Sequence, residues 1–174
     1  MSDWIVRDAR RDPQSVTPAW QPAGRRLIDG VAVKEILSVV VDGGHVTEIW
    51  RRDWGLDALP VDEVFQRVIH PGELSAWHAH RETTERLFCG TGAVKLVLFD
   101  GRAASPTAGL INELRLGELR PAVVVVPPGV WHGVMNIGAG RAILVNAVDR
   151  AYRYDDPDHW RAPADSPDIP YRWR

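Results

Sequence analysis

The chain has 174 residues, a formal net charge of −2 and one cysteine. This length suits one domain, residues 1–174, with a core of its own, and the scattered basic residues argue against a nucleic-acid surface. No apolar run is long enough to cross a bilayer, and residues 1–12 lack the apolar centre of a secretory signal. We therefore expect a cytoplasmic protein that binds neither nucleic acid nor membrane. Cys89 lies in an apolar segment and is expected to be buried.

The first segment, residues 1–23, mixes charges, prolines and tryptophans with little periodicity, which predicts an N-terminal arm. Its Trp4 and Trp20 side chains need a surface to pack against, either the protein's own barrel or a partner subunit. Between residues 31 and 53, apolar and polar positions alternate on both sides of an Asp-Gly-Gly sequence at 42–44. This pattern predicts two strands joined by a turn.

Short strands separated by turn residues continue to residue 149. After a proline-containing loop at 54–63, strands are predicted in residues 64–69, 93–100, 110–118, 122–126, 129–136 and 141–149. The spacing, with no long amphipathic helix, predicts an all-β fold, an antiparallel barrel or jelly roll over residues 24–150. Residues 151–174, rich in proline, aspartate and aromatic residues, are expected to wrap this barrel as loops with one helical turn.

Two histidines and a glutamate stand between residues 72 and 92. His78 and His80 are two positions apart, so on a strand both imidazoles project from one face. Glu85 follows a polar turn and can reach the same point from the next strand, and His132 offers a fourth ligand far downstream. Three imidazoles and one carboxylate suit a divalent transition metal such as Zn, Mn, Ni, Fe or Cu, with positions open for water or substrate. The spacing therefore predicts a catalytic-type metal site.

The same residues resemble the two-part signature of the cupin family, in which two histidines, a glutamate and a later histidine recur at fixed distances. The match comprises Gly72, His78, His80, Glu85 and Gly92, then Pro127, Gly129, His132 and Asn136. One departure is Pro121, where the family has a glycine. The resemblance implies a cupin barrel, which is a double-stranded β-helix of antiparallel strands.

Longer stretches resemble the dTDP-4-dehydrorhamnose 3,5-epimerase family, cupins that act on deoxy-keto sugars carried on a nucleotide. These stretches are residues 44–51, 105–109, 126–133 and 165–173, in the family's order. The resemblance implies an epimerase or isomerase that removes a proton beside a keto group. It also implies a small-molecule substrate, either a sugar or a sugar nucleotide.

Residues at the expected active site depart from the set that this family uses. His78 matches the family's base, but Ser75 stands where the family has an arginine and Glu85 where it has a lysine. The aspartate that orients the base falls near Asp165 or Ser166. The family's ordinary site is metal-free, whereas here two cations are missing and a carboxylate has entered. We expect a divalent ion to replace the lost cations, because it stabilises the negative charge that develops on the carbonyl oxygen.

The general base stays open, because a histidine that binds a metal is not a free base. The candidates are Tyr152 and Tyr154, which lie near the position of the family's tyrosine, Glu48, and a hydroxide on the metal. Two other functions also remain open at this point. Three histidines and a glutamate suit an Fe(II)-dependent oxygenase, and a cupin can bind a sugar without catalysis.

Substrate contacts and assembly follow from the same resemblance. Gln66 and Arg67 lie where the family meets its nucleotide, and Arg51 on the preceding strand is placed to reach a phosphate. An antiparallel barrel with an aromatic arm has strand edges that pairing across a two-fold axis would protect, so we expect a homodimer. The family is similar in exchanging an early strand between subunits, which would put Glu48 and Arg51 at the partner's site.

Overall fold

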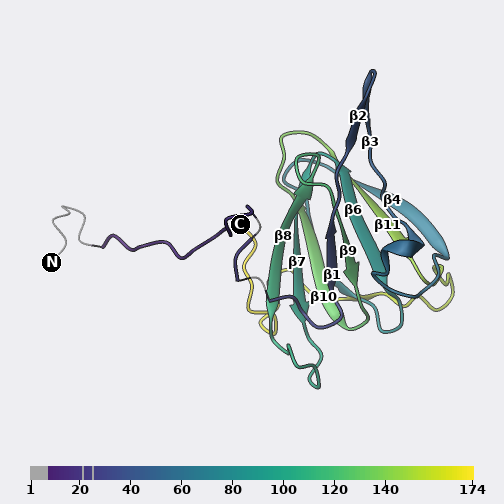
Figure 1. The fold of residues 1–174 in the computed structure, drawn as a ribbon. Coiled ribbons are helices and arrows are strands. Elements are labelled where there is room, and N and C mark those ends of the chain that lie inside the picture. Colours follow the sequence, from purple (N-terminus) through teal and green to yellow (C-terminus); the bar gives the residue numbers. More distant parts are fainter. Residues whose placement is uncertain (1–7, 21, 25) are drawn as a thin grey trace.

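The structure is a computed structural model and describes residues 8–20, 22–24 and 26–174, which form two five-stranded antiparallel sheets (Figure 1). In order across the first sheet, the strands are β1 (Ala32–Glu35), β9 (Ala122–Val126), β6 (Glu85–Thr91), β11 (Ala142–Val148) and β4 (Glu63–Ile69). In the second sheet they are β12 (Trp160–Arg161), β5 (Leu74–Ala79), β10 (Val130–Asn136), β7 (Ala93–Asp100) and β8 (Ile111–Gly117). The prediction of an all-β antiparallel fold is confirmed.

Two further elements lie outside these sheets. β2 (Val39–Val41) pairs with β3 (Gly44–Val46) as a hairpin, so the predicted turn at Asp-Gly-Gly is confirmed. A short 3-10 helix, η1 (Arg52–Trp54), follows the hairpin. Within the described ranges, no helix is long and apolar enough to cross a membrane.

The apolar core lies between the two sheets. Leu87 and Val124 from the first sheet and Leu96 and Leu114 from the second belong to one buried cluster. Burying side chains of this size stabilises the fold by about 1.5–3 kcal/mol each. Cys89 is part of the same cluster, and burial raises the pKa of its thiol to about 11. The prediction that this cysteine is a buried apolar side chain is therefore confirmed.

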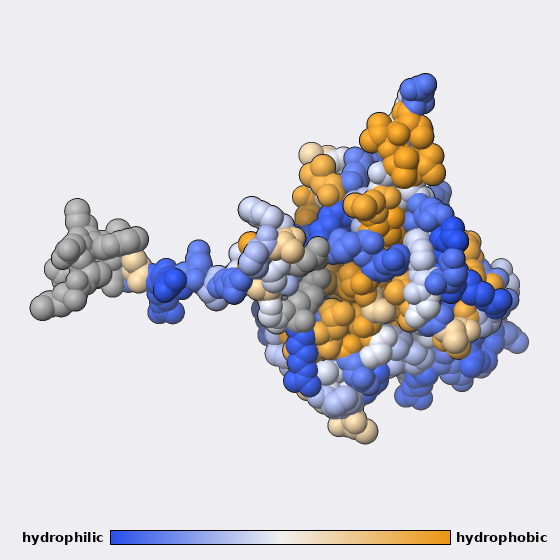
Figure 2. All heavy atoms as spheres, viewed as in Figure 1, coloured by the Kyte–Doolittle hydropathy of each residue, from blue (hydrophilic) through white to orange (hydrophobic). Residues whose placement is uncertain are grey.

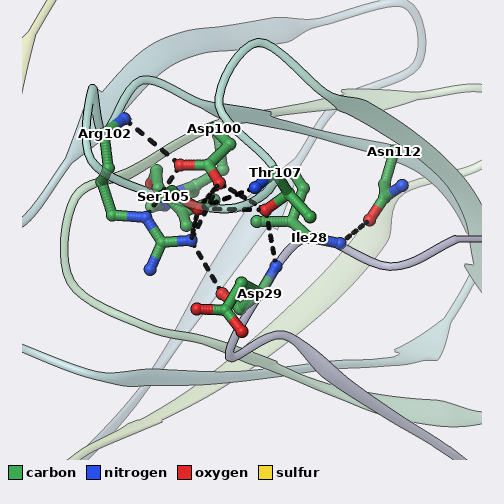
Figure 3. A network of polar contacts seen from close by, with 9 residues as sticks. Ile28, Asp29, Asp100, Arg102, Ser105, Thr107 and Asn112 are labelled. Carbon is green, nitrogen blue, oxygen red and sulfur yellow. Dashed lines mark hydrogen bonds and ion pairs between the residues drawn. The ribbon is translucent and has the colours of Figure 1, made fainter.

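A polar network fastens the segment ahead of β1 to the loop that follows β7 (Figure 3). The buried carboxylate of Asp100 accepts hydrogen bonds from Ser105 (2.5 Å) and Thr107 (2.6 Å) and forms an ion pair with Arg102 (2.8 Å). Arg102 also donates to the main-chain carbonyl of Asp29 (2.7 Å), whose amide donates to the Thr107 hydroxyl (2.9 Å). These contacts fix the start of the barrel.

The predicted N-terminal arm is described from residue 8 onward, except for residue 21, and it extends away from the barrel (Figure 1). Trp4 lies outside the described residues. Trp20 has an exposed fraction of 83%, so its side chain does not pack on the barrel of its own chain. The expectation that a partner subunit covers it stays a prediction.

The β2–β3 hairpin projects from the barrel and carries an apolar surface (Figures 1 and 2). The exposed apolar side chains of the hairpin are Val39, Val40, Val41 and Val46, of which Val40 is 83% exposed, and Leu37 just ahead of it is exposed as well. β4 is an edge strand, and its Val64 and Val68 are also exposed. Exposed apolar residues on a hairpin and an open strand edge are typical of a surface that another chain covers.

The C-terminal segment, residues 151–174, returns along the second sheet. β12 pairs with β5, the strand that carries His78. Further along, Tyr171 and Trp173 pack on the buried Trp77, with ring centroids 5.9 and 5.1 Å away. The prediction of a helical turn in this segment is wrong. The backbone instead forms the short strand β12 at the edge of the second sheet. Pairing with β5 gives main-chain groups of β12 hydrogen-bond partners in the protein, which an isolated helical turn would leave to solvent.

Candidate active site

A cavity of about 510 Å³ opens between the two sheets. Its apolar walls include Leu87 and Leu144 from the first sheet and Leu96 and Val134 from the second. Polar side chains enter this apolar space from both sheets and from the C-terminal segment. A mainly apolar cavity with a few converging polar groups is the usual form of a small-molecule site.

His78 and His80 reach the cavity from β5 and from the residue just after it. Their spacing of two places both imidazoles on the inner face, as the sequence predicts, while Trp77, just before them, is buried on the opposite face against the C-terminal segment. The strand therefore has two functions, because one face holds the histidines and the other anchors the chain end.

Three of the four predicted ligands converge. One ligand atom from each of His80, Glu85 and His132 lies within 4.8 Å of the other two. Nε2 of His132 is 2.7 Å from one Glu85 oxygen, and Nε2 of His80 is 3.5 Å from the other. Nε2 of His132 and Oε2 of Glu85 are buried, yet neither has a hydrogen bond of good geometry to a described residue. Each of the two atoms therefore has the other, or a bound group, as its polar partner.

His78 lies beside this group but is not part of it. Its ring packs edge-on against the ring of His132, with centroids 4.3 Å apart. Its Nδ1 atom is buried and has no hydrogen-bond partner among the described residues. The prediction that four ligands converge is therefore wrong for His78, which lines the cavity next to the His80–Glu85–His132 group.

Burial and mutual contact set the charges in the cavity. Burial, together with the nearby His132, lowers the pKa of His78 to about 2, so this imidazole is neutral at pH 7. Burial acts in the same direction on His80, but its contact with Glu85 outweighs it and raises the pKa of His80. Burial alone would raise the pKa of Glu85, but the imidazoles of His132 and His80 hold it well below its usual value. Glu85 is therefore an anion inside an apolar cavity.

Of the other residues predicted for the site, some line the cavity and some do not. Arg67 lines the cavity, and its guanidinium donates a hydrogen bond to Ser75 (2.6 Å). Tyr152 also lines the cavity, whereas Tyr154 packs against Tyr152 with 92% of its surface exposed and is not a lining residue. Gln66 is not a lining residue either, because neighbouring residues on strand β4 point to opposite faces.

Glu48 and Arg51 lie outside the cavity of their own chain. Arg51 is exposed and forms ion pairs with Glu48 (3.0 Å) and Asp53 (2.6 Å), which raise its pKa. Both residues follow the projecting β2–β3 hairpin. A role for them at a site of the same chain has no support in this geometry, so their predicted role depends on a partner subunit.

Three residues of the site were absent from the sequence prediction. Asn146 donates a hydrogen bond to Glu85 (2.5 Å) and His159 enters the cavity beside His80, with ring centroids 5.1 Å apart. The main-chain carbonyl of Asp158 meets Nδ1 of His80. No spacing rule connects these residues to the ligand motif, because the pairing of β11 with β6 brings Asn146 to the cavity and the pairing of β12 with β5 brings the C-terminal segment there.

Comparison with known proteins gives relatives of similar length. Over 147 residues the chain is 32% identical to the probable low-salt glycan biosynthesis epimerase Agl13 of Haloferax volcanii, with 84% of this chain and 94% of that protein aligned. It is 31% identical over 147 residues to the spore coat polysaccharide biosynthesis protein SpsL of Bacillus subtilis, with 84% and 97% aligned. No family model matches the chain.

Solved structures agree with these relatives. A dTDP sugar isomerase from Desulfovibrio desulfuricans superposes with a TM-score of 0.78 at 29% identity, covering 84% of this chain and 92% of that one. ChmJ, a 3'-monoepimerase from Streptomyces bikiniensis in complex with dTDP-quinovose, superposes with a TM-score of 0.74 at 23% identity, covering 84% and 76%, which is a likeness of fold. Together with the sequence relatives, these matches show that the chain belongs to the family of sugar epimerases related to dTDP-4-dehydrorhamnose 3,5-epimerase, which has the cupin fold.

Proposed function

We propose that this protein is an epimerase or isomerase of a keto-deoxysugar carried on a nucleotide, and that it removes a proton from the carbon beside the keto group. The observation that carries the proposal is the convergence of His80, Glu85 and His132 within an apolar cavity. Relatives that are a glycan biosynthesis epimerase and a dTDP sugar isomerase support the same class of reaction.

His78 is the proposed proton acceptor. Its buried imidazole is neutral at pH 7, which is the form that accepts a proton. Burial and the nearby His132 lower the pKa of His78 and disfavour the protonated form that results, whereas the carboxylate of Glu85 favours it. Tyr152 is the proposed donor of the replacement proton, since of the two tyrosines that the sequence nominates it is the one that lines the cavity.

Cations at the cavity wall are the proposed site for the nucleotide's phosphates. Arg67, Arg150 and Arg153 all line the cavity. Arg150 and Arg153 lie 3.3 and 4.0 Å from the exposed carboxylate of Glu82, which an anionic ligand can displace. Guanidinium groups bind phosphate oxygens through charge-assisted hydrogen bonds.

A divalent ion such as Zn, Mn, Ni or Fe fits the His80–Glu85–His132 group. Two imidazole nitrogens and a carboxylate oxygen are ligands that these ions accept, and the buried Nε2 of His132 and Oε2 of Glu85 lack good hydrogen bonds. The carbonyl of Asp158 at Nδ1 of His80 is the kind of contact that orients a metal-binding imidazole. When bound, the ion would act as a Lewis acid on the keto oxygen.

Elemental analysis tests the metal directly. Protein purified without chelators or a histidine tag is expected to contain close to one equivalent of a single divalent metal. Dialysis against a chelator is expected to abolish turnover, and one of the four ions is expected to restore it. Metal-free protein with full turnover would rule out the ion while leaving the epimerase proposal in place.

A homodimer is the proposed assembly. The exposed valines of the β2–β3 hairpin and the open edge of β4 support it, because pairing between two chains covers both. Glu48 and Arg51 follow the hairpin and would then lie at the partner's cavity. This arrangement gives these two residues the roles in substrate binding that their own chain does not.

A second function has one observation in its favour, because two histidines and one carboxylate are also the ligand set of Fe(II)-dependent oxygenases. Incubation with a dTDP-4-keto-6-deoxy sugar in deuterated water separates the two reactions. The epimerase proposal predicts deuterium beside the keto group without consumption of O2. Consumption of O2 without exchange would establish the oxygenase, and tight binding with neither would establish a sugar-binding protein.

A further inference from the structure

We propose that Asp158 is a positioning residue for His80, and that it acts by fixing which ring nitrogen of His80 carries a proton. The proposal rests on the proposed function of the cavity for its kinetic consequence only. Its structural content is independent of the reaction, because it concerns one hydrogen atom on one ring.

The side chain of Asp158 closes the turn that connects the two ligand strands. One carboxylate oxygen accepts a hydrogen bond from the amide of Arg81 (2.8 Å), and the other accepts from the amides of Glu82 (2.8 Å) and Thr83 (3.0 Å) and from the Thr83 hydroxyl (3.1 Å). This turn links His80 to Glu85. Asp158 therefore holds the backbone between two members of the candidate metal group.

The main chain of Asp158 acts on the imidazole itself. Its carbonyl oxygen meets Nδ1 of His80. A carbonyl oxygen can only accept a hydrogen bond, so Nδ1 of His80 carries the hydrogen. Nε2 is then the atom that faces Glu85, at 3.5 Å, with its lone pair free whenever the ring is neutral. A fixed tautomer is what a metal ion or a substrate hydroxyl needs from this ring.

Contacts on both sides hold this carbonyl in place. The carboxylate of Asp158 itself is held by the main-chain amides of Arg81, Glu82 and Thr83. After Asp158, Trp160 pairs with Ala79 on β5, and the guanidinium of Arg81 lies 3.9 Å from the centre of the Trp160 ring. The pairing of β12 with β5 covers Trp160 and Arg161 and does not include Asp158. The hydrogen bonds of the Asp158 carboxylate are therefore needed to orient its carbonyl toward His80.

Nitrogen spectra of the full-length protein test the proposal. Long-range ¹H–¹⁵N correlation at the histidine rings, recorded at a pH at which the His80 ring is neutral and assigned by comparison with His80→Gln, is expected to place the hydrogen of native His80 on Nδ1. Asp158→Ala is expected to shift part of the population to the Nε2–H form. Asp158→Asn keeps one accepting oxygen for the turn and is expected to retain the native signature. Asp155→Ala, at an exposed aspartate of the same segment, is the matched control.

A kinetic split accompanies the spectra. Asp158→Ala is expected to lower kcat for proton exchange about 10–100-fold, as is typical when a contact behind a functional histidine is lost, with KM nearly unchanged and rescue by Asp158→Asn. An Nε2–H signature in the native protein, or an unchanged Nδ1–H signature in Asp158→Ala, would overturn the proposal. If the native protein exchanges no proton, the proposed function fails, while the spectra still decide the role of Asp158.

Discussion

The guanidinium of Arg67 donates a 2.6 Å hydrogen bond to the hydroxyl of Ser75, and so brings a cation beside the strand that carries His78. Arg67 comes from β4 and lines the cavity. Strand β4 thus supplies a positive charge next to β5. If Arg67 binds the anionic part of the substrate, its charge contributes to substrate affinity.

Arg67→Met removes this charge and keeps much of the side-chain length. We expect KM for a dTDP-sugar to rise about 10-fold, which corresponds to a loss of about 1.4 kcal/mol of binding, with a smaller change in kcat. Steady-state kinetics measure both. Arg115→Met, at an exposed residue of β8 outside the cavity lining, serves as the control, and an unchanged KM in Arg67→Met would contradict the assignment.

Glu85→Gln replaces the central carboxylate by a neutral group of the same shape. Exchange of the substrate's proton is expected to fall about 100-fold or more, because electrostatic stabilisation by one buried group is commonly worth that much, and the metal content of the purified protein should fall in parallel. The fold is expected to survive, since Asn146 still hydrogen-bonds this position. Exchange at the native rate in Glu85→Gln would show that the carboxylate has no part in the reaction.

Val40→Glu tests the proposed assembly. Val40 is near the tip of the projecting hairpin and is 83% exposed in the single chain, so a charge there costs the monomer little. At an interface the same charge would be buried without a partner. Light scattering coupled to size exclusion is expected to give a dimer for the native protein and a monomer for the variant, and a native monomer would refute the dimer.

Asp100→Asn tests the network that fastens the first strand. Loss of the charge weakens the contacts with Arg102, Ser105 and Thr107, and we expect the free energy of unfolding to fall by about 2 kcal/mol. Urea unfolding at pH 7 measures this difference. Asp168→Asn, at an exposed aspartate, should leave the stability within experimental error of the native value.

The effect of Asp100 also has a defined pH dependence. Burial alone would raise the pKa of Asp100, but the hydrogen bonds from Arg102, Ser105 and Thr107 outweigh it and lower the pKa. A lowered pKa in the folded state stabilises the protein above the unfolded-state pKa of about 4. The difference in unfolding free energy between native protein and Asp100→Asn is therefore expected to be constant above about pH 5 and to shrink below about pH 4. A difference that grows on acidification would contradict this sign.

Much of the fold could be predicted from local patterns. Alternation and turn residues placed β4, β7, β8 and β9 close to their observed bounds, and the spacing of two correctly put His78 and His80 on one face. The β2–β3 hairpin was predicted longer than it is, because only three residues on each side of the turn pair. Periodicity describes which faces are apolar, and it does not determine where a ladder ends.

The site was only partly accessible from the sequence. Glu85 and His132 were predicted to meet because their residue types and spacing match a ligand set, and they do lie together with His80. Asn146 and His159 were missed, since both reach the cavity through pairing between distant segments that no local pattern encodes. Tyr154 and Gln66 were nominated from alignment to the family, and neither lines the cavity.

The deuterium content of a recovered substrate tests most directly whether this cavity removes a proton beside a keto group. The native protein is incubated anaerobically with a dTDP-4-keto-6-deoxy sugar in deuterated water, and the sugar is then examined by NMR and mass spectrometry. We expect deuterium at the carbon beside the keto group at a catalytic rate, and incorporation slower by about 100-fold or more with Glu85→Gln. Binding of the sugar to the native protein without any incorporation of deuterium would contradict this expectation.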